Sequence, residues 1–145
     1  MAGFSIHETD WMHDAARLGA IRRAVFIDEQ GVPESLEWDE YDACSVHLLA
    51  TADDGGTPIG CARLLPDGHL GRMAVLRSWR GQGVGSALLK DALAAARRAG
   101  MTRVELSAQC HATDFYRRAG FVQRGAVYQE AGIPHVSMTL SLIAA

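Results

Sequence analysis

The pattern with the clearest chemistry is a glycine cluster that begins with arginine, RGQGVGS at residues 80–86. Glycine has no Cβ, so Gly81, Gly83 and Gly85 let a ligand approach the backbone closely. The cluster precedes an expected helix, whose first N–H groups have no partner within the helix and attract phosphate. Arg80 adds a full positive charge beside them. The pattern predicts a phosphate-binding loop, and a plain glycine turn before a helix is the alternative.

Two common nucleotide-binding motifs fit this loop poorly. A Walker A motif needs G-x-x-x-x-G-K-[ST], which does not occur in the sequence. A dinucleotide fingerprint needs G-x-G-x-x-G and, about 20 residues later, an acidic residue at the end of a strand. Gly81, Gly83 and Ser86 nearly match it, but Glu105 falls inside its expected strand. We therefore expect a phosphate compound that is bound in neither of these two ways.

The sequence pattern around this loop predicts a mixed α/β sheet in one domain, residues 1–145, whose elements position the loop. Apolar runs predict short strands at residues 4–7, 45–52, 59–65, 69–75, 103–107, 121–128 and 135–142. Helical spacing predicts helices at residues 10–26, 83–99 and 112–119, and turn residues cluster at 53–58, 66–68 and 130–134. Residues 27–44 are interpreted as a loop with at most one short helix. The sum is an antiparallel meander, a parallel β-α-β crossover and a C-terminal hairpin, about six or seven strands in all.

The composition argues against several classes of protein. The formal net charge is −3 with no basic stripe, so no nucleic-acid partner is expected. Cysteines number three without a CxxC pair, which is typical of a reducing compartment. No apolar stretch approaches the ~20 residues of a membrane span, and the N-terminus does not resemble a signal peptide. We expect a cytoplasmic protein with no membrane partner and, since Cys110-His111 has no second pair at ligand spacing, no metal.

Two motifs together resemble those of the GNAT acetyltransferase superfamily. Residues 80–85, RGQGVG, match its [QR]-x-x-G-x-[GA] loop, and residues 108–121 resemble its second signature, a short helix ending in F-Y-x-x-x-G-F. Residues 25–30, 71–75, 108–109 and 130–135 resemble the ElaA-like branch more narrowly. The resemblance covers nearly the whole chain. It implies the GNAT-like acyl-CoA N-acyltransferase fold and transfer of acetyl from acetyl-CoA to the primary amine of a small molecule.

The resemblance also implies roles for individual residues. The pantetheine arm of CoA would lie between splayed parallel strands at residues 69–75 and 103–107, with the Val75 N–H as oxyanion donor. Tyr116 would protonate the leaving thiolate; its reference pKa is about 10, and that of a thiol is about 8.5. Packing of Tyr116 with Phe115 and Phe121 is the alternative. The implied cofactor-binding residues are Met73, Ala74, Val75, Arg80, Gly81, Gln82, Gly83, Val84, Gly85, Ser86, Gln109 and Tyr116.

The base and the acceptor contacts are less defined by the sequence. A primary amine titrates near about 10 and must lose a proton before it attacks a thioester. Glu29, Glu130 and His135 are the candidate bases, since they lie in the segments that resemble the family and flank the expected acceptor cleft. His135 titrates in the right range, and filling a turn is its alternative role. Gln30, Glu130 and His135 are candidates to bind the acceptor, and a water chain could also take the proton.

Several alternatives stay open at this point. The acidic stretch 34–42 is interpreted as a solvated loop, although it could attract a cationic acceptor. A module that senses acyl-CoA without turnover, and an acetyltransferase of protein N-termini or lysines, are competing functions. The complete loop and Tyr116 favour the enzyme. A homodimer is left open by family analogy.

Overall fold

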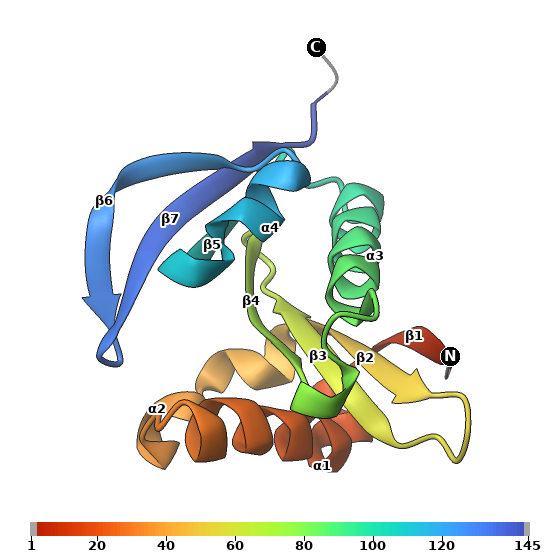
Figure 1. The fold of residues 1–145 in the computed structure, drawn as a ribbon. Helices are drawn as coiled ribbons and strands as arrows, with labels where there is room; N and C mark the ends of the chain where they lie inside the picture. Colours follow the sequence, from red (N-terminus) through yellow and green to blue (C-terminus); the bar gives the residue numbers. More distant parts are fainter. Residues whose placement is uncertain (1–2, 144–145) are drawn as a thin grey trace.

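The computed structural model describes residues 3–143 and contains a seven-stranded sheet in the order β1-β2-β3-β4-β5-β7-β6 (Figure 1). Neighbouring strands are antiparallel except for β4 and β5, which are parallel. The predicted meander, crossover and C-terminal hairpin are therefore confirmed. The strands are β1 (Phe4–Thr9), β2 (Val46–Ala52), β3 (Pro58–Leu64), β4 (His69–Val75), β5 (Arg103–Gln109), β6 (Val122–Glu130) and β7 (Ile133–Ser141).

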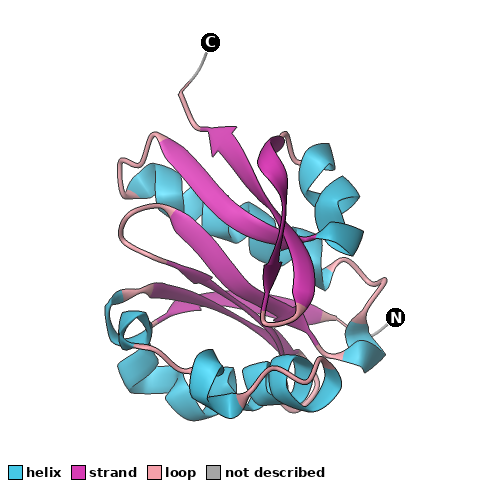
Figure 2. Ribbon diagram, turned by 90° about the vertical axis from the view of Figure 1, so that its left-hand side faces the viewer, coloured by secondary structure: helices cyan, strands magenta, loops and turns pink. Residues whose placement is uncertain are grey.

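Helices cover both faces of the sheet (Figure 2). Successive residues of β2 explain this arrangement, because side chains alternate between the faces of a strand. Leu49 packs with the first helix, α1, whereas Leu48 packs with α3. The helical segments are α1 (Trp11–Arg22), a π-helix η1 (Arg23–Glu29), α2 (Glu34–Glu37), α3 (Val84–Arg98) and α4 (Thr113–Arg118), with 3₁₀ turns η2 (Glu40–Cys44), η3 (Arg77–Trp79) and η4 (Cys110–Ala112). None of these helices is long and apolar enough to cross a membrane.

The first helix begins as the sequence predicts and ends later. The Asp10 side chain caps it by accepting a hydrogen bond from the His13 N–H at 2.9 Å. The expected end near residue 26 is wrong, because the chain continues as the π-helix to Glu29. The expected loop at 27–44 also contains α2 and η2. The extension places Glu29 against Arg80, in the segment that follows β4.

The parallel strands β4 and β5 pair over a short length and then separate. Only His69 with Glu105 and Leu70 with Leu106 are in register among the described residues. Beyond Leu70 the two ribbons diverge (Figure 1). The pairing of β3 with β4 also shifts there, and Arg72 has a φ of 46°, in the left-handed region that a non-glycine residue rarely adopts. A bulge at Arg72 thus turns β4 away from β5.

Buried ion pairs hold the segment before β2 against this bulge. The Arg22 side chain is 1% exposed and donates to Glu37 at 2.9 Å and to Asp42 at 2.6 Å. Arg63 and Arg72 bind the same acidic segment from β3 and β4. The interpretation of residues 34–42 as a solvated loop is wrong at Glu37 and Asp42, which are both buried. We call this group the buried charge cluster; it consists of Arg22, Glu37, Asp39, Asp42, Arg63 and Arg72.

The carboxyl groups of the cluster respond differently to burial. Burial raises the pKa of Glu37, and the charges of Arg72 and Arg22 offset this only in part. Burial also opposes ionisation of Asp42, but hydrogen bonds from Arg22 outweigh it and keep the pKa of Asp42 below its usual value. The indole rings of Trp11 and Trp38 lie 5.3 and 5.0 Å from the Arg22 guanidinium, as cation–π contacts. The cluster is therefore a tightly coupled part of the core.

The C-terminal hairpin is longer than predicted. The turn consists of Ala131 and Gly132 alone, with φ values of 51° and 76°, as a two-residue hairpin turn requires. The expected turn at 130–134 is therefore too wide, because Ile133 and Pro134 already pair with β6. The strands β6 and β7 extend past the rest of the sheet (Figure 1). His135 pairs with Gln109 at the end of β5, and the Glu130 carboxylate lies 3.5 Å from the His135 ring.

Replacing Arg22 with Met should lower the free energy of unfolding by about 3–5 kcal/mol, because Glu37 and Asp42 would stay buried without their main partner. Urea denaturation of both proteins measures the difference. The matched control is Arg98→Met, which removes an exposed ion pair with Glu8 and should cost no more than about 1 kcal/mol. Similar losses in the free energy of unfolding of both variants would contradict the inference that the cluster stabilises the core.

Candidate active site

A cleft of about 1220 Å³ lies where β4 and β5 separate. It collects side chains from η1, β4, the β5–α4 junction and the C-terminal hairpin. The residues predicted from the sequence that line it are Glu29, Gln30, Met73, Ala74, Val75, Arg80, Gly85, Gln109, Tyr116, Glu130 and His135. The others, Gly81, Gln82, Gly83, Val84 and Ser86, belong to the glycine loop and first turn of α3 beside it.

The glycine loop leaves the start of α3 open. Gly81 and Gly83 have φ values of 78° and 88°, and a Cβ on either would meet no atom within 4 Å. Gly83 caps α3 without a side-chain hydrogen bond, so the first N–H groups of the helix lack protein partners among residues 3–143. Val84 is buried in the core and contributes backbone only. The loop offers both the space and the donors that an anion needs.

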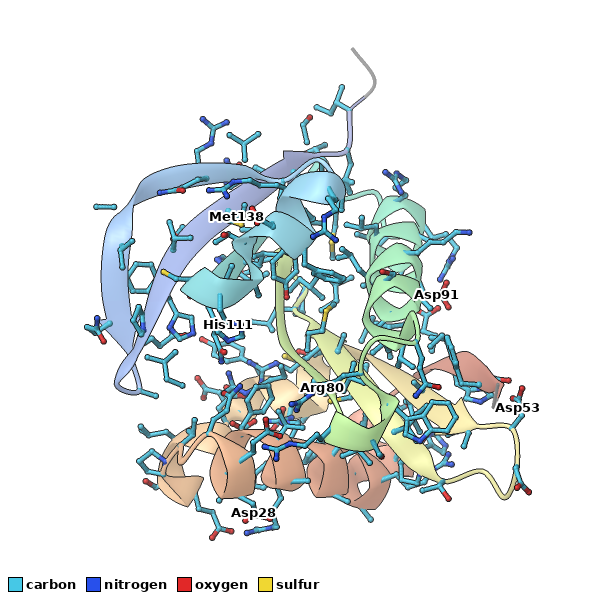
Figure 3. The ribbon with its side chains drawn as sticks, in the orientation of Figure 1. Asp28, Asp53, Arg80, Asp91, His111 and Met138 are labelled. Carbon is cyan, nitrogen blue, oxygen red and sulfur yellow. The ribbon has the colours of Figure 1, made fainter. Side chains whose placement is uncertain are left out.

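Arg80 and Glu29 form one ion pair at the mouth of the cleft. The guanidinium of Arg80, which is labelled in Figure 3, donates to the two carboxylate oxygens of Glu29 at 2.7 and 2.8 Å. The Arg80 Nε donates to the Val75 carbonyl at 3.0 Å. Hydrogen bonding to Arg80 lowers the pKa of Glu29, although partial burial opposes the effect. A carboxylate with a lowered pKa is a weaker base, so this contact does not favour Glu29 as the group that removes the amine proton.

Tyr116 packs its ring in the core and directs its hydroxyl to the cleft. Its ring packs against Phe115 and Phe121 with centroid distances of 5.0 and 5.9 Å. Its hydroxyl reaches the cleft and lies 3.7 Å from the sulfur of Met73 on β4. Burial raises the pKa of the phenol to about 12, so it stays protonated at neutral pH. The site therefore holds a fixed hydrogen-bond donor beside the gap between the strands.

His135 has a defined hydrogen-bond arrangement. Its Nδ1 lies 2.7 Å from the Ile133 carbonyl, which accepts only, so Nδ1 carries a hydrogen. In the neutral ring, Nε2 is then the basic nitrogen, and it lies 3.5 Å from the Glu130 carboxylate. The ring is stacked on Tyr128, whose hydroxyl is hydrogen-bonded to Ser107 on β5. This geometry leaves one nitrogen of a nearly buried imidazole able to accept a proton.

Gln30 and Gln109 bind each other across the cleft. The Gln109 Nε2 donates to the Gln30 Oε1 at 2.8 Å, and the reverse bond is 3.3 Å long. His111, which is labelled in Figure 3, adds a third group, with its Nε2 2.7 Å from the Gln109 side-chain oxygen. The two glutamines, predicted for acceptor and cofactor respectively, thus link η1 to the end of β5 in this state.

Sequence reasoning missed several residues that line or support the cleft. Arg63 and Arg72 line it from inside β3 and β4. The signal available was a charged residue within each apolar strand, since buried charges need partners. Tyr128, which stacks on His135, had no comparable signal in the sequence. Residues 3–143 contain no group of three His, Cys, Asp or Glu side chains placed to hold a metal ion.

Comparisons with known proteins agree with this geometry. Residues 13–142 match the family model described as acetyltransferase (GNAT) domain. The N-acetyltransferase YjcF of Bacillus subtilis is 38% identical and aligns over 81% of this chain and 86% of its own. Protein ElaA of Escherichia coli is 32% identical over 86% of each chain, and its crystal structure superposes with a TM-score of 0.82 over 93% of this chain and 98% of ElaA. An acyl-CoA N-acyltransferase from Pseudomonas aeruginosa has a TM-score of 0.82, 34% identity, and coverage of 96% and 99%.

Replacing Arg80 with Gln should raise the pKa of Glu29 towards its usual value, because the largest influence that lowers it is removed. A pH titration of the glutamate carboxyl ¹³C shifts by NMR measures the change. The folded pKa lies below the unfolded one, so any stability from the pair is complete above about pH 4.3 and is lost as the pH falls through the folded pKa.

The control for this titration is Arg98→Gln, whose guanidinium binds Glu8 far from the cleft. It should leave the Glu29 titration unchanged. A Glu29 pKa that is the same in the wild type and in Arg80→Gln would show that the ion pair is absent in solution.

Proposed function

Because the chain belongs to the acetyltransferase (GNAT) family, in its ElaA-like branch, we propose that it moves the acetyl group of acetyl-CoA to the primary amine of a small molecule. The observation that carries the proposal is the open start of α3 beside the gap between β4 and β5. The start of α3 supplies N–H groups that can donate hydrogen bonds to phosphate. The gap between the strands supplies space for an extended chain. The similarity to an acyl-CoA N-acyltransferase supports the same chemistry with acyl-CoA in general.

The loop residues fit the diphosphate of CoA. A phosphate oxygen can approach Gly81 and Gly83 because no side chain lies over them, and Gly83 leads directly into the free N–H groups of α3. In this proposal Arg80 holds the loop to Glu29 and Val75, while the backbone takes the phosphates. Ser86 follows in the first turn of α3, next to the same donors.

The backbone of β4 offers a donor for the tetrahedral intermediate. The Leu76 N–H points towards β3, where it donates to the Ile59 carbonyl at 2.9 Å. Successive N–H groups along an extended strand point to opposite edges, so the Val75 N–H faces the gap. An N–H group fixed there stabilises the negative charge that develops on the acetyl oxygen. This supports Val75 as the oxyanion donor.

The remaining roles follow from the proton balance. The neutral amine attacks the thioester carbon, a C–N bond forms, the C–S bond breaks, and the nitrogen gives up one proton. We assign that proton to His135 Nε2, directly or through water. A Tyr116 pKa of about 12 lies far above that of a thiol at about 8.5, so complete proton transfer to the thiolate is unfavourable. We therefore assign to Tyr116 a hydrogen bond to the leaving sulfur in place of complete proton transfer.

Gly83→Asp should abolish binding of CoA, because it places a side chain and a negative charge where the diphosphate would lie. Isothermal titration calorimetry with CoA measures the effect. The matched control is Gly56→Asp, which introduces the same residue at another glycine with positive φ and open surroundings, in the β2–β3 turn. Unchanged CoA affinity in a folded Gly83→Asp variant would remove the loop assignment.

Tyr116→Phe should lower kcat by about 10²-fold and leave the affinity for CoA unchanged, since only the hydrogen bond to the leaving group is lost. Release of free CoA during acetylation of an amine, followed with a thiol reagent, gives the rate. The ring packing with Phe115 and Phe121 stays intact, so the melting temperature serves as the control for folding. Equal turnover by the two proteins would eliminate the role of the hydroxyl.

A further inference from the structure

Leu36 and Tyr41 are large side chains that line the cleft and yet stay exposed. Leu36 is 57% exposed and Tyr41 is 46% exposed. Phe26, Val32 and Ile133 line the same cleft and are half-buried. Single exposed apolar residues are common on a protein surface, but ligand pockets are lined mainly by apolar and aromatic side chains. We call these five residues the apolar wall of the cleft.

The buried charge cluster holds the backbone that carries Leu36. Glu37, the next residue, is 3% exposed and accepts a hydrogen bond from Arg22. The Arg72 Nη2 donates to the Glu37 carbonyl at 3.1 Å and to the Leu36 carbonyl at 3.5 Å. Leu36 is therefore exposed on an anchored segment, which presents its side chain to the cleft in a fixed position.

Tyr41 is held in a similar way. Its N–H donates to the Asp39 carboxylate at 3.0 Å, and its carbonyl accepts from the Ser45 hydroxyl at 2.6 Å. Asp42, the next residue, is buried. The Tyr41 hydroxyl has no hydrogen-bond partner in the part of the chain that the structure describes. A ligand can therefore cover the ring without displacing a hydrogen bond of this side chain.

The arginines of the cleft give an acceptor no free charge to bind. Each of them already lies at ion-pair distance from a carboxylate of the protein. The pairs are Arg63 with Asp39 and Asp42, Arg72 with Glu37 and Asp39, and both Arg77 and Arg80 with Glu29. An acceptor that carries a carboxylate, or a second ammonium, would have to break one of these pairs to find a partner there.

Glu130 differs from the other carboxylates of the cleft. Within residues 3–143 its ion-pair partner is His135, whose Nε2 lies 3.5 Å away. In the proposed reaction His135 is neutral before it takes the proton, so the charge of Glu130 is then free to attract the ammonium form of the acceptor. The cleft thus provides for one positive charge, beside the base, and for an apolar surface elsewhere.

We propose that the acceptor is a primary monoamine with an apolar alkyl tail, and that the tail lies against the apolar wall. The inference rests on the proposed function, because the acetyl transfer places the amine beside His135. Covering Leu36 and Tyr41 removes apolar surface of both partners from water, which favours binding in proportion to the area covered. The wall takes no part in bond making; it selects which amine is held at the thioester.

The test uses the full-length protein saturated with CoA, in which an acceptor binds without reacting. Calorimetric titrations compare the unbranched alkylamines from butylamine to octylamine. Each methylene that reaches the wall should tighten binding by about threefold, over at least two successive members of the series. Octylamine should also bind about tenfold more tightly than 1,7-diaminoheptane or 7-amino-1-heptanol, which have the same number of heavy atoms and a polar end.

Leu36→Asp tests the wall directly, because it places a carboxylate on the apolar surface. It should remove the gain with chain length and make 1,7-diaminoheptane bind at least as tightly as octylamine. The matched control is Met12→Asp, which changes an apolar residue that is 90% exposed and lies outside the cleft; it should keep the preference for octylamine. Tyr41→Ser is a second variant, which should reduce the gain per methylene if Leu36→Asp does not fold.

The outcomes separate the two proposals. Affinity that does not depend on chain length, or tighter binding of the diamine or the amino alcohol than of octylamine, overturns the apolar acceptor and leaves acetyl transfer standing. A gain per methylene that is the same in the wild type and in a folded Leu36→Asp or Tyr41→Ser variant overturns it as well. Absence of CoA binding overturns the proposed function, and the same titrations on the protein without CoA then decide the apolar wall.

Discussion

The bulge at Arg72 is the constraint on which the rest of the site depends. A non-glycine residue with a φ of 46° costs on the order of 1–3 kcal/mol, and here the ion pairs of Arg72 with the buried Glu37 and the half-buried Asp39 offset it. The bulge turns β4 away from β5 and opens the cleft. The same contact fixes the segment before β2 as one wall of that cleft. One backbone irregularity therefore creates both the slot for a thioester and a surface for its acceptor.

The two ends of the cleft are coupled through short connections. Glu29 closes η1 and holds Arg80, while Arg80 also holds the Val75 carbonyl, next to the N–H assigned to the oxyanion. Gln30, one residue later, binds Gln109 across the gap. A movement of η1 would thus shift the glycine loop, the oxyanion donor and the end of β5, because these contacts join all three to η1. The acidic residue that the sequence suggested as a base is better explained as the link between these parts.

Local patterns in the sequence were sufficient for most of the fold and for the glycine loop. The cap at Asp10, the turn glycines and the spacing of apolar residues each depend on a few neighbouring residues, which is why they could be predicted. The misses around the acidic segment and the Arg80–Glu29 pair depend on contacts between distant residues. Arg80 and Glu29 are 51 positions apart, and Arg22 reaches Asp42 only because the intervening chain folds back over the sheet. No local pattern reports that an acidic stretch is buried or that a helix continues as a π-helix.

The central claim is that the gap between β4 and β5, with the open start of α3, binds an acyl-CoA. Calorimetric titration of the purified protein with acetyl-CoA, with NAD as the comparison ligand, tests it most directly. The account predicts micromolar binding of acetyl-CoA and none of NAD, since the loop fits a diphosphate followed by an extended arm and lacks the dinucleotide fingerprint. Binding of NAD without binding of acetyl-CoA, or binding of neither, would contradict the account.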